Sequence, residues 1–431
     1  MDLSVIVLIV SFIVLLALNV PIAISIGIAT LLTMLFTISP GPAITTVAQQ
    51  MATGINSFAL LAIPFFILSG LLMGQGGIAR RLIDFAKVLV GMLPGGLAFV
   101  NILACMFFGA ISGSAVAATS AIGGFMIPIM NKEGYDKNFS TAVTVTAATT
   151  GLLIPPSNVL IVYSLASGGV SIAALFIAGY LPGILVGLGL VTVTGIISLQ
   201  KGYPRGDWIP FIDAAKKFLD ALPALLLIVI VIGGIIAGIF TATEASAVAV
   251  LYSLVLSVVI YREIKVSELP AILLRAVETT AIVMLLIGTS RAMSWILSYE
   301  NIPQDISATL IALTDNRVII LLVINVILLI VGTFMDMTPA VLIFTPILLP
   351  VVMQLGMTPL HFGIMMILNL CIGLCTPPVG SVLFVGCSVG KTSITSMIRP
   401  LLPLYLAMVI ALLLVTYISA ISQWLPGLLG Y

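Results

Sequence analysis

Long apolar runs separated by short polar segments recur along the whole chain. A helix that crosses a lipid bilayer needs about 20 apolar residues, so the pattern predicts about ten membrane-spanning helices. The predicted helices cover residues 3–18, 21–36, 55–74, 139–167, 173–199, 222–240, 242–261, 276–298, 362–387 and 400–421. Two further apolar segments, 92–130 and 318–353, have polar, flexible centres, and we interpret each as a re-entrant hairpin of two half-helices. A pair of full spans joined by a short loop is the alternative.

Paired prolines interrupt two of the predicted helices, in "TGLLIPPSNV" (150–159) and "IGLCTPPVGS" (372–381). Proline removes a backbone donor and moves the preceding residue away from helical geometry. Irregular backbone at membrane depth is tolerated only where it is buried in protein or lines a wet cavity. We therefore predict two functional breaks, with a merely structural kink as the alternative.

The two halves of the chain match at a constant offset of 222 residues. Gly151 matches Gly373, Gly134 matches Gly356, and the proline pairs match each other. The segment 108–130 also aligns with 331–353 to within one residue. Such a run of matches at one offset indicates an internal duplication.

Composition agrees with a polytopic membrane protein. Of 431 residues, 61% are hydrophobic and only 7% are charged, whereas a soluble domain carries about 25% charged residues. The net charge of +1 gives no indication of a nucleic-acid partner. The four cysteines lie in apolar runs without metal-type spacing, so we expect buried thiols. We expect His361, near a loop edge, to be an ordinary polar residue.

The basic residues predict the orientation of the helices. Five loops contain 14 of the 16 lysine and arginine residues, and they cover 76–91, 131–138, 200–217, 262–275 and 388–399. Cytoplasmic loops of membrane proteins are enriched in these residues. With these loops inside, the first hairpin enters from the cytoplasm and the second from the opposite side. The two repeats are then inverted, and both chain termini are periplasmic.

Inverted repeats with discontinuous helices are typical of secondary transporters. Free carbonyl groups at a break suit Na⁺, and the N-termini of half-helices attract an anionic substrate group. A channel is one alternative, although channels usually repeat a pore around an axis. An intramembrane enzyme is another, because "ISGSA" (111–115) resembles the surroundings of a serine nucleophile. The single histidine, His361, is expected at an outer loop, so we predict that the protein is not an enzyme.

Four stretches resemble the large membrane subunit of tripartite ATP-independent periplasmic (TRAP) transporters. They are "LLAIPFFILSG" (60–70), "LIPPSNVLIVY" (153–163), "GTFMDMTPAVLIFTPILLPV" (332–351) and "HFGIMMILNLCIGLCTPPVG" (361–380). The resemblance implies an elevator-type carrier in the bacterial inner membrane, with Na⁺ as coupling ion and no other cofactor. It also implies a small membrane subunit and a periplasmic binding protein that delivers an organic acid. A carrier that works without a binding protein is the alternative.

The chain is most similar in general appearance to the sialic-acid members of that family, which would make N-acetylneuraminate the substrate. C4-dicarboxylates and sugar acids are the alternatives. The family also implies a scaffold and a moving transport unit. We assign 1–91 and 173–317 to scaffold helices with their interfacial arms, 92–172 and 318–395 to the transport unit, and 396–431 to a C-terminal helix.

The resemblance implies two Na⁺ sites and a substrate site between the hairpin tips. The first Na⁺ site would be formed by Ser112, Ser114, Gly151, Ile154 and Pro156. The second would be formed by Gly332, Asp336, Thr338, Gly373, Thr376 and Pro378. The substrate would lie near Ser114, Ser157, Asn158, Asp336 and Ser381. For Asp336, a helix-capping role ahead of Pro339 is the alternative, because aspartate is a preferred N-cap residue.

Three further features are left outside these sites. Glu244 and Arg291 fall in predicted spans of the scaffold, where we expect a structural pair or a contact with the small subunit. The segment 76–96 has apolar residues at helical spacing beside Arg80, Arg81 and Lys87. It predicts an interfacial helix that leads into the first hairpin, with an ordinary loop helix as the alternative.

Overall fold

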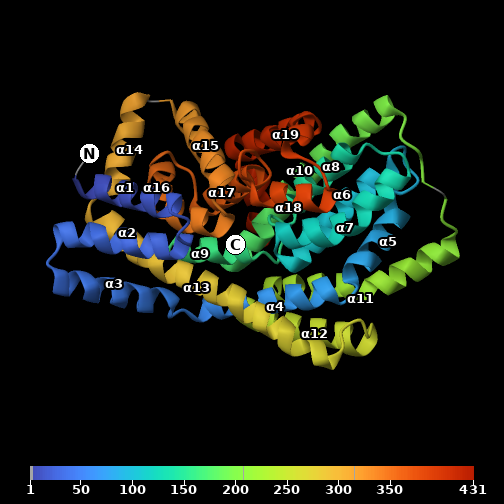
Figure 1. Ribbon diagram of the computed structural model, residues 1–431, viewed down its shortest axis with the longest axis horizontal. Helices are drawn as coiled ribbons and strands as arrows, with labels where there is room; N and C mark the ends of the chain where they lie inside the picture. Colours follow the sequence, from blue (N-terminus) through green and yellow to red (C-terminus); the bar gives the residue numbers. More distant parts are fainter. Residues whose placement is uncertain (1–2, 207, 315) are drawn as a thin grey trace.

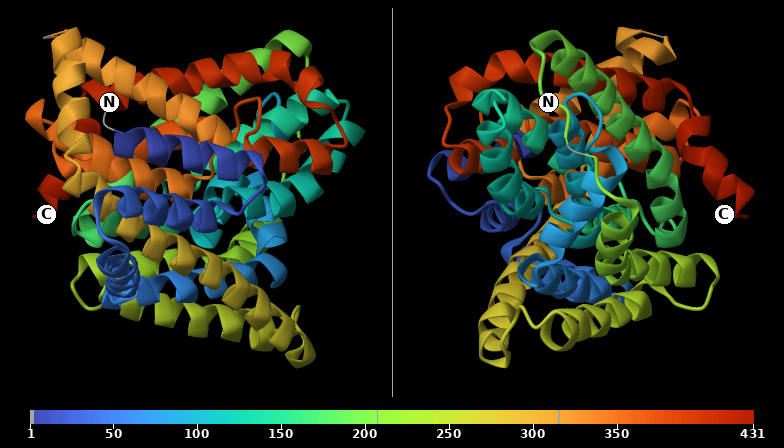
Figure 2. Two further views of the ribbon diagram at one scale, coloured as in Figure 1. Left: turned by 60° about the vertical axis from the view of Figure 1, so that its left-hand side comes forward. Right: turned by 90° about the vertical axis from the view of Figure 1, so that its right-hand side faces the viewer.

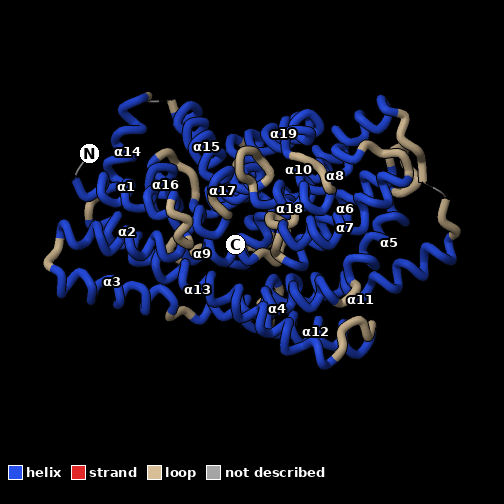
Figure 3. Tube along the Cα trace, in the orientation of Figure 1, coloured by secondary structure: helices blue, strands red, loops and turns tan. Residues whose placement is uncertain are grey.

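The computed structural model describes residues 3–206, 208–314 and 316–431. Within these ranges the chain is helical, and the only extended pairing is an isolated bridge between Pro94 and Arg205 (Figure 3). The helices of the first half are α1 (Leu3–Ala17), α2 (Ile22–Thr37), α3 (Pro40–Ile55), η1 (Phe58–Leu61), α4 (Ala62–Gln75), α5 (Ile78–Val90), α6 (Gly96–Ser112), α7 (Ala115–Lys132), α8 (Lys137–Thr150), α9 (Asn158–Ala166) and α10 (Ile172–Lys201). Those of the second half are α11 (Phe211–Ile236), α12 (Ala242–Leu254), η2 (Val255–Ile260), η3 (Val266–Glu268), α13 (Leu269–Tyr299), α14 (Ile302–Leu313), α15 (Arg317–Phe334), α16 (Met337–Gln354), α17 (Pro359–Leu374), α18 (Ser381–Gly390), α19 (Ile394–Tyr417) and α20 (Ala420–Leu428).

The helices agree with the apolar runs in most places. Eight helical segments of the described chain are long and apolar enough to cross a membrane. Both predicted hairpins form as helix pairs, α6 with α7 and α15 with α16, while their re-entrant character stays a prediction. Both predicted breaks split a helix, between α8 and α9 and between α17 and α18. Three predicted helices begin later than the observed α11, α13 and α19, because charged or polar residues lie within the first turns of each observed helix. The helix predicted over 76–96 is α5, and α6 takes over at Gly96.

The duplication is visible in the fold. Shifted by 222 residues, α7 coincides with α16, and α6 coincides with α15 to within one residue at its start. The matched glycines Gly134 and Gly356 end these helices with left-handed φ angles of 84° and 77°. The thiol of Cys371 lies 3.2 Å from the carbonyl oxygen of Thr149, its own counterpart in the first repeat. A contact between equivalent residues means that the pseudo-twofold axis of the repeats passes between α8 and α17.

The helices form two layers (Figure 1). We call α6–α10 and α15–α19 the hairpin layer, and α1–α5 with α11–α13 the support layer, while α14 packs mainly against α16 beside the hairpin layer. In the support layer α13 packs against α2, α3 and α4, while α12 packs against α4. The layers meet where α13 contacts α16 and where α4 contacts α6 and α9. Figure 2 shows α4, α12 and α13 below the hairpin layer from two further sides.

The division into scaffold and transport unit stays a prediction, and the packing differs from it at α10 and α19. The sequence predicts α10 as part of the scaffold and α19 as part of a separate C-terminal segment. In the structure α10 packs against α19, α17, α6 and α8, and α19 also packs against α8. Both helices therefore lie in the hairpin layer, because each follows directly after a broken helix and folds back along it.

The five basic loops gather at one end of the molecule, at the right of Figure 1. The amine of Lys137 donates to the carbonyl of Lys391 at 2.6 Å, and the amide of Gly206 donates to the carbonyl of Gly91 at 3.1 Å. Arg81 lies 3.7 Å from Glu263. At the opposite end the Ser4 hydroxyl donates to Glu300 at 2.8 Å, and the hydroxyl of Tyr417, the last residue of α19, donates to Val318 at 2.8 Å. This separation matches the charge pattern, while the side of the membrane that each end faces stays a prediction.

All four cysteines are buried free thiols, as expected. The expectation for His361 is wrong. Because α17 already begins at Pro359, His361 lies in its first turn, buried, with Nε2 2.7 Å from the carbonyl oxygen of Val415 on α19.

Candidate transport site

The tip of the first hairpin is the sequence Ser112–Gly113–Ser114. Gly113 reverses the chain with a φ of 62°, a conformation that favours glycine. Ser114 is the N-cap of α7, and its hydroxyl accepts a hydrogen bond of 3.2 Å from the amide of Ala117. The buried hydroxyl of Ser112 donates to the carbonyl of Ser114 at 3.4 Å. The tip therefore places two serine hydroxyls at the N-terminus of α7.

The tip meets the first break through glycines. A Cβ atom placed on Gly151 would lie 2.4 Å from the Cα atom of Gly109, so the backbones of α6 and the break are in direct contact. A Cβ atom on Gly113 would lie 3.2 Å from Nδ2 of Asn158, the first residue of α9. On the other side, α10 approaches the break through Gly179, where a Cβ atom would lie 2.1 Å from the carbonyl oxygen of Leu153.

The second hairpin and the second break repeat this arrangement. A Cβ atom on Gly373 would lie 2.5 Å from the Cα atom of Gly332, which makes the same glycine contact between arm and break. The amide of Gly380 donates to the carbonyl of Thr333 at 3.0 Å, which ties the end of the break to the end of α15. Both hairpin tips are therefore held against the broken helices of their own repeats.

Carbonyl groups converge in the second break. Gly380 has a φ of 44°, and a Cβ atom there would lie 2.8 Å from the carbonyl oxygen of Thr376 and 2.9 Å from that of Leu374. The carbonyl of Cys375 is already occupied, because it accepts a hydrogen bond from the hydroxyl of Tyr405 on α19. The position equivalent to Tyr405 in α10 is Gly183, so the two breaks have different surroundings.

A cavity of about 310 Å³ lies between the two tips and the support layer. Its lining includes Ile67 and Gly70 of α4 together with Thr279 and Val283 of α13. Six residues predicted for the sites also line it: Ser112, Ser114, Asn158, Asp336, Thr338 and Ser381.

Polar atoms in this cavity lack partners within the protein. In the described chain, Oδ1 of Asn158 and the hydroxyl of Ser381 are buried without a hydrogen-bond partner. Asp336 lines the cavity with an exposed side chain. It occupies the N-cap position of α16, but its carboxylate makes no capping hydrogen bond. These groups are free to bind a ligand or an ion.

The N-termini of half-helices surround the cavity. In the described chain, α7, α9, α16 and α18 each place a residue of their first turn or N-cap in its wall, namely Ser114, Asn158, Met337 and Ser381. Each helix N-terminus carries about half a positive charge and unsatisfied amide donors. Four positive helix ends therefore lie at one cavity, with the Asp336 carboxylate beside them, and the substrate site stays a prediction.

The remaining predicted residues do not line this cavity. Gly151 and Gly332 form the glycine contacts between hairpin arm and break. Ser157 is buried at the end of the first break, and its hydroxyl has no hydrogen-bond partner in the described chain. The others predicted for the Na⁺ sites lie in the breaks away from the lining: Ile154, Pro156, Gly373, Thr376 and Pro378. The two Na⁺ sites as sets stay predictions. Sequence reasoning missed Gly109, Gly70 and Tyr405, although Gly109 lies within a residue of the repeat counterpart of Gly332 and could have been found from the offset.

The expectation of a structural pair for Glu244 and Arg291 is wrong. Glu244 forms a capping box with Thr241 at the start of α12, with its Oε2 2.8 Å from the Thr241 amide. This happens because α12 begins at Ala242, which places Glu244 in the first turn of the helix. Arg291 lies on α13 and lines a different pocket.

Fold and site together define an inverted-repeat membrane transporter built from helical hairpins and broken helices. Two solved structures share the fold: the Alcanivorax borkumensis YdaH transporter (TM-score 0.59, 15% identity, 88% of this chain and 87% of that chain) and Neisseria gonorrhoeae MtrF (TM-score 0.58, 11% identity, 87% and 84%). The family model of the tripartite ATP-independent periplasmic transporter, DctM component, matches residues 9–421. The chain belongs to this family of transporter permeases and is not an enzyme.

Curated relatives match along almost the whole chain. The uncharacterized protein YgiK of Salmonella typhimurium is 55% identical, with 97% of this chain and 96% of that protein covered. The C4-dicarboxylate TRAP transporter large permease DctM of Rhodobacter capsulatus and the sialic acid TRAP transporter large permease SiaM of Vibrio cholerae are both 39% identical, with 96% of each chain covered. The isethionate TRAP transporter permease DctMQ of Oleidesulfovibrio alaskensis is 42% identical over 96% of this chain, which spans 65% of that longer protein.

Proposed function

We propose that this chain is the large permease of a tripartite system that imports a small organic anion together with Na⁺. The observation that carries this proposal is the convergence of four half-helix N-termini on one cavity beside Asp336. The helix termini and the unpartnered amide and hydroxyl groups supply an anion site. Carbonyl groups at the breaks and the carboxylate of Asp336 supply oxygen ligands for Na⁺, whose charge offsets the cost of a carboxylate at membrane depth.

The position of the cavity supports an elevator mechanism. Its ligand-binding groups come from the hairpin layer, whereas the wall formed by α4 and α13 comes from the support layer. Movement of the hairpin layer along this wall would carry the bound anion and Na⁺ from one side of the membrane to the other. Gly70 of α4 favours such sliding, because a Cβ atom there would lie 2.7 Å from the carbonyl oxygen of Ser112.

The substrate class follows from the donors in the cavity, which suit a carboxylate or a sulfonate. A volume of about 310 Å³ lies at the lower end of the range for ligand pockets, about 300–1,000 Å³, and favours a small anion. Relatives are named for C4-dicarboxylate, isethionate and sialic acid. N-acetylneuraminate, the substrate that the family resemblance suggests first, therefore belongs in the same test as the smaller anions.

The proposed partners are a small membrane subunit and a periplasmic binding protein, with the complex in the bacterial inner membrane. Support for the small subunit comes from DctMQ, whose name combines the two permease components in one protein. The binding protein is proposed from the family description alone.

The test is uptake into proteoliposomes that contain this chain and its small subunit. Radiolabelled succinate, isethionate and N-acetylneuraminate are each offered with the binding protein, under an inward Na⁺ gradient and under a matched K⁺ gradient. We expect uptake of at least one anion with Na⁺ and the binding protein only. Na⁺-driven uptake without the binding protein would favour a stand-alone carrier, and uptake that ignores the Na⁺ gradient would contradict the proposal.

A further inference from the structure

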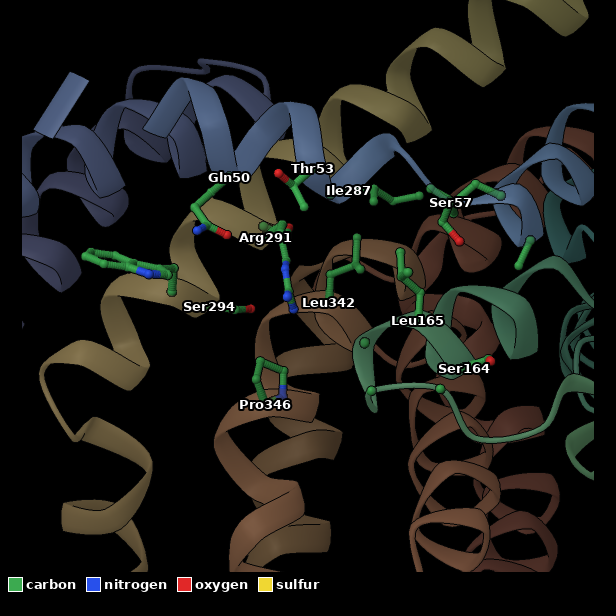
Figure 4. A pocket seen from close by; sticks show the side chains of 18 of the residues that line it. Gln50, Thr53, Ser57, Ser164, Leu165, Ile287, Arg291, Ser294, Leu342 and Pro346 are labelled. Carbon is green, nitrogen blue, oxygen red and sulfur yellow. The ribbon is translucent and has the colours of Figure 1, made fainter. Parts of the chain in front are cut away.

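A second cavity, of about 560 Å³, lies in the half of the molecule away from the basic loops (Figure 4). One wall consists of α3 and α13 from the support layer, and the other consists of α9 and α16 from the hairpin layer. The cavity is therefore a second space between the two layers, separate from the one at the hairpin tips.

Arg291 is the only charged residue among those that line this cavity. Within the described residues, its guanidinium has no ion pair, since the three ion pairs found there involve Arg81, Lys216 and Lys217. The neighbouring hydroxyl of Ser290 is buried without a hydrogen-bond partner. An arginine in a membrane-spanning helix is costly unless it faces a cavity or a partner, so its place here needs a functional reason.

The structure holds the Arg291 side chain in one direction. A Cβ atom on Gly54 of α3 would lie 2.7 Å from Cβ and 2.9 Å from Cγ of Arg291, so the aliphatic stem packs directly on the glycine. Figure 4 shows the guanidinium extending from α13 toward Leu342 on α16, with Ser294 beside it. The charge is thus presented to the centre of the cavity.

The inverted repeat does not require a cation at this position. The equivalent residue in α4 is Ser69, which is buried and shares a hydrogen bond of 2.8 Å with Ser253 of α12. The cation is present in one repeat only, at the end that the charge pattern assigns to the periplasm.

The two cavities lie one helical turn apart along the same helices. On α13, Val283 lines the tip cavity and Ile287 lines the Arg291 cavity. On α16, Thr338 and Leu342 are related in the same way, and α9 contributes Val162 to one cavity and Leu165 to the other. Residues four apart on a helix are separated by about 6 Å along its axis.

We propose that the Arg291 cavity is an outer anion subsite, which binds the carboxylate or sulfonate group of the transported anion before it reaches the hairpin tips. Guanidinium pairs with such groups through two parallel hydrogen bonds. Ser290 and Ser294 supply further donors. For the class of ligand, this proposal rests on the proposed function. It also places the entry side of the transport pathway at the end of the molecule that contains Arg291.

Trp295 gives a direct readout of this subsite. It lies one turn after Arg291, lines the same cavity and stacks on Tyr299 with a centroid distance of 5.2 Å. The other two tryptophans, Trp208 and Trp424, are 71% and 57% exposed, so they are replaced by phenylalanine to leave one reporter. The permease, with its small subunit, is titrated in Na⁺-free buffer with choline succinate, isethionate or N-acetylneuraminate, with glycerol phosphate as the lipid-headgroup probe, and with choline chloride as blank.

We expect a saturable change in Trp295 emission with at least one anion, an affinity lowered about tenfold or more in Arg291→Gln, and a smaller loss in Arg291→Lys. Arg317→Gln, which removes a cation at the same end of the molecule, should leave the titration unchanged. The proposal is overturned if no anion exceeds the chloride blank, if the response survives in Arg291→Gln, or if only glycerol phosphate produces it, which would indicate a lipid headgroup site.

A separate variant distinguishes this proposal from the transport proposal. Asp336→Asn should raise the Na⁺ concentration that uptake requires but keep the Trp295 response, because Asp336 does not line the outer cavity. Loss of the response in Asp336→Asn would contradict an independent subsite. Absence of uptake in the unmodified protein would refute the proposed function. The Trp295 titration would then still decide whether the Arg291 cavity binds an anion.

Discussion

At the scale of single residues, the site depends on which polar groups make no hydrogen bond to their own helix. Ser114 caps α7 with its hydroxyl, whereas Asp336 occupies the equivalent N-cap of α16 without making a capping bond. The sequence offered a capping role for Asp336 as an alternative and did not predict the cap at Ser114, because packing decides whether a side chain turns to its own helix or to a cavity. The same holds for the glycine contacts. The offset pairs Gly151 with Gly373, but their contacts with Gly109 and Gly332 depend on how the hairpin arms pack.

Asp336→Asn tests the role of the carboxylate. Asparagine caps a helix about as well as aspartate, so a purely capping role predicts wild-type Na⁺ activation. We expect the Na⁺ concentration for half-maximal uptake to rise about tenfold or more, since loss of a charged ligand costs more than about 1.4 kcal/mol. The measurement is the Na⁺ dependence of initial uptake rates. Asp213→Asn, at an exposed residue that contacts only Lys216, serves as control.

Gly151→Ala tests the contact between hairpin arm and break. The added methyl group would lie 2.4 Å from the backbone of Gly109, so the arm must move away. We expect a loss of about 1–3 kcal/mol, as is usual for overpacking, and a large reduction in uptake. The control is Gly124→Ala in α7, where a Cβ atom would meet no atom within 4 Å. Equal melting temperatures for the two variants would mean that the contact is not close.

At the scale of helices, hydrophobicity predicted the long apolar elements and failed for the others. The missed helix α3 carries Gln49, Gln50 and several threonines, and it forms because one face packs on α2 and α13. The missed α14 and α20 are too short to be recognised as spans. The breaks were predictable because proline acts locally, whereas the surroundings of each break were not, because they come from α10 and α19.

Tyr405→Phe tests whether the hydroxyl from α19 stabilises the second break. Removing the donor leaves the carbonyl of Cys375 unpaired, which costs about 1–3 kcal/mol at a buried site. We expect a raised Na⁺ requirement, because the carbonyls of the break lose their fixed positions. Tyr417→Phe removes a hydroxyl that donates to Val318 at the surface and is the matched control. The same Na⁺ dependence in both variants would exclude this role.

At the scale of the whole molecule, the repeat and the charge pattern predicted the architecture. The offset of 222 residues relates whole helices, and the basic loops lie together at one end. The two-layer arrangement and the second cavity were beyond sequence reasoning, because they depend on contacts between α13, α16 and α9 that no local pattern encodes.

The inverted orientation is tested by cysteine labelling. Lys201 lies at the end of α10 among the basic loops, and Asn301 lies at the opposite end between α13 and α14. In a background without the four native cysteines, Lys201→Cys should react with a membrane-impermeant maleimide only from the cytoplasmic side. Asn301→Cys should react only from the periplasmic side. Labelling of both from one side would contradict the topology.

The central claim is that one cavity couples an organic anion to Na⁺, and simultaneous fluxes test it most directly. Proteoliposomes with the permease, its small subunit and the loaded binding protein are given radioactive sodium and the labelled anion that shows Na⁺-driven uptake. We expect that each flux requires the other solute, that both fall together in Asp336→Asn at the Na⁺ concentration that half-activates the unmodified protein, and that their ratio is constant across gradients. Anion uptake without accompanying sodium entry, or sodium entry that continues without the anion, would contradict it.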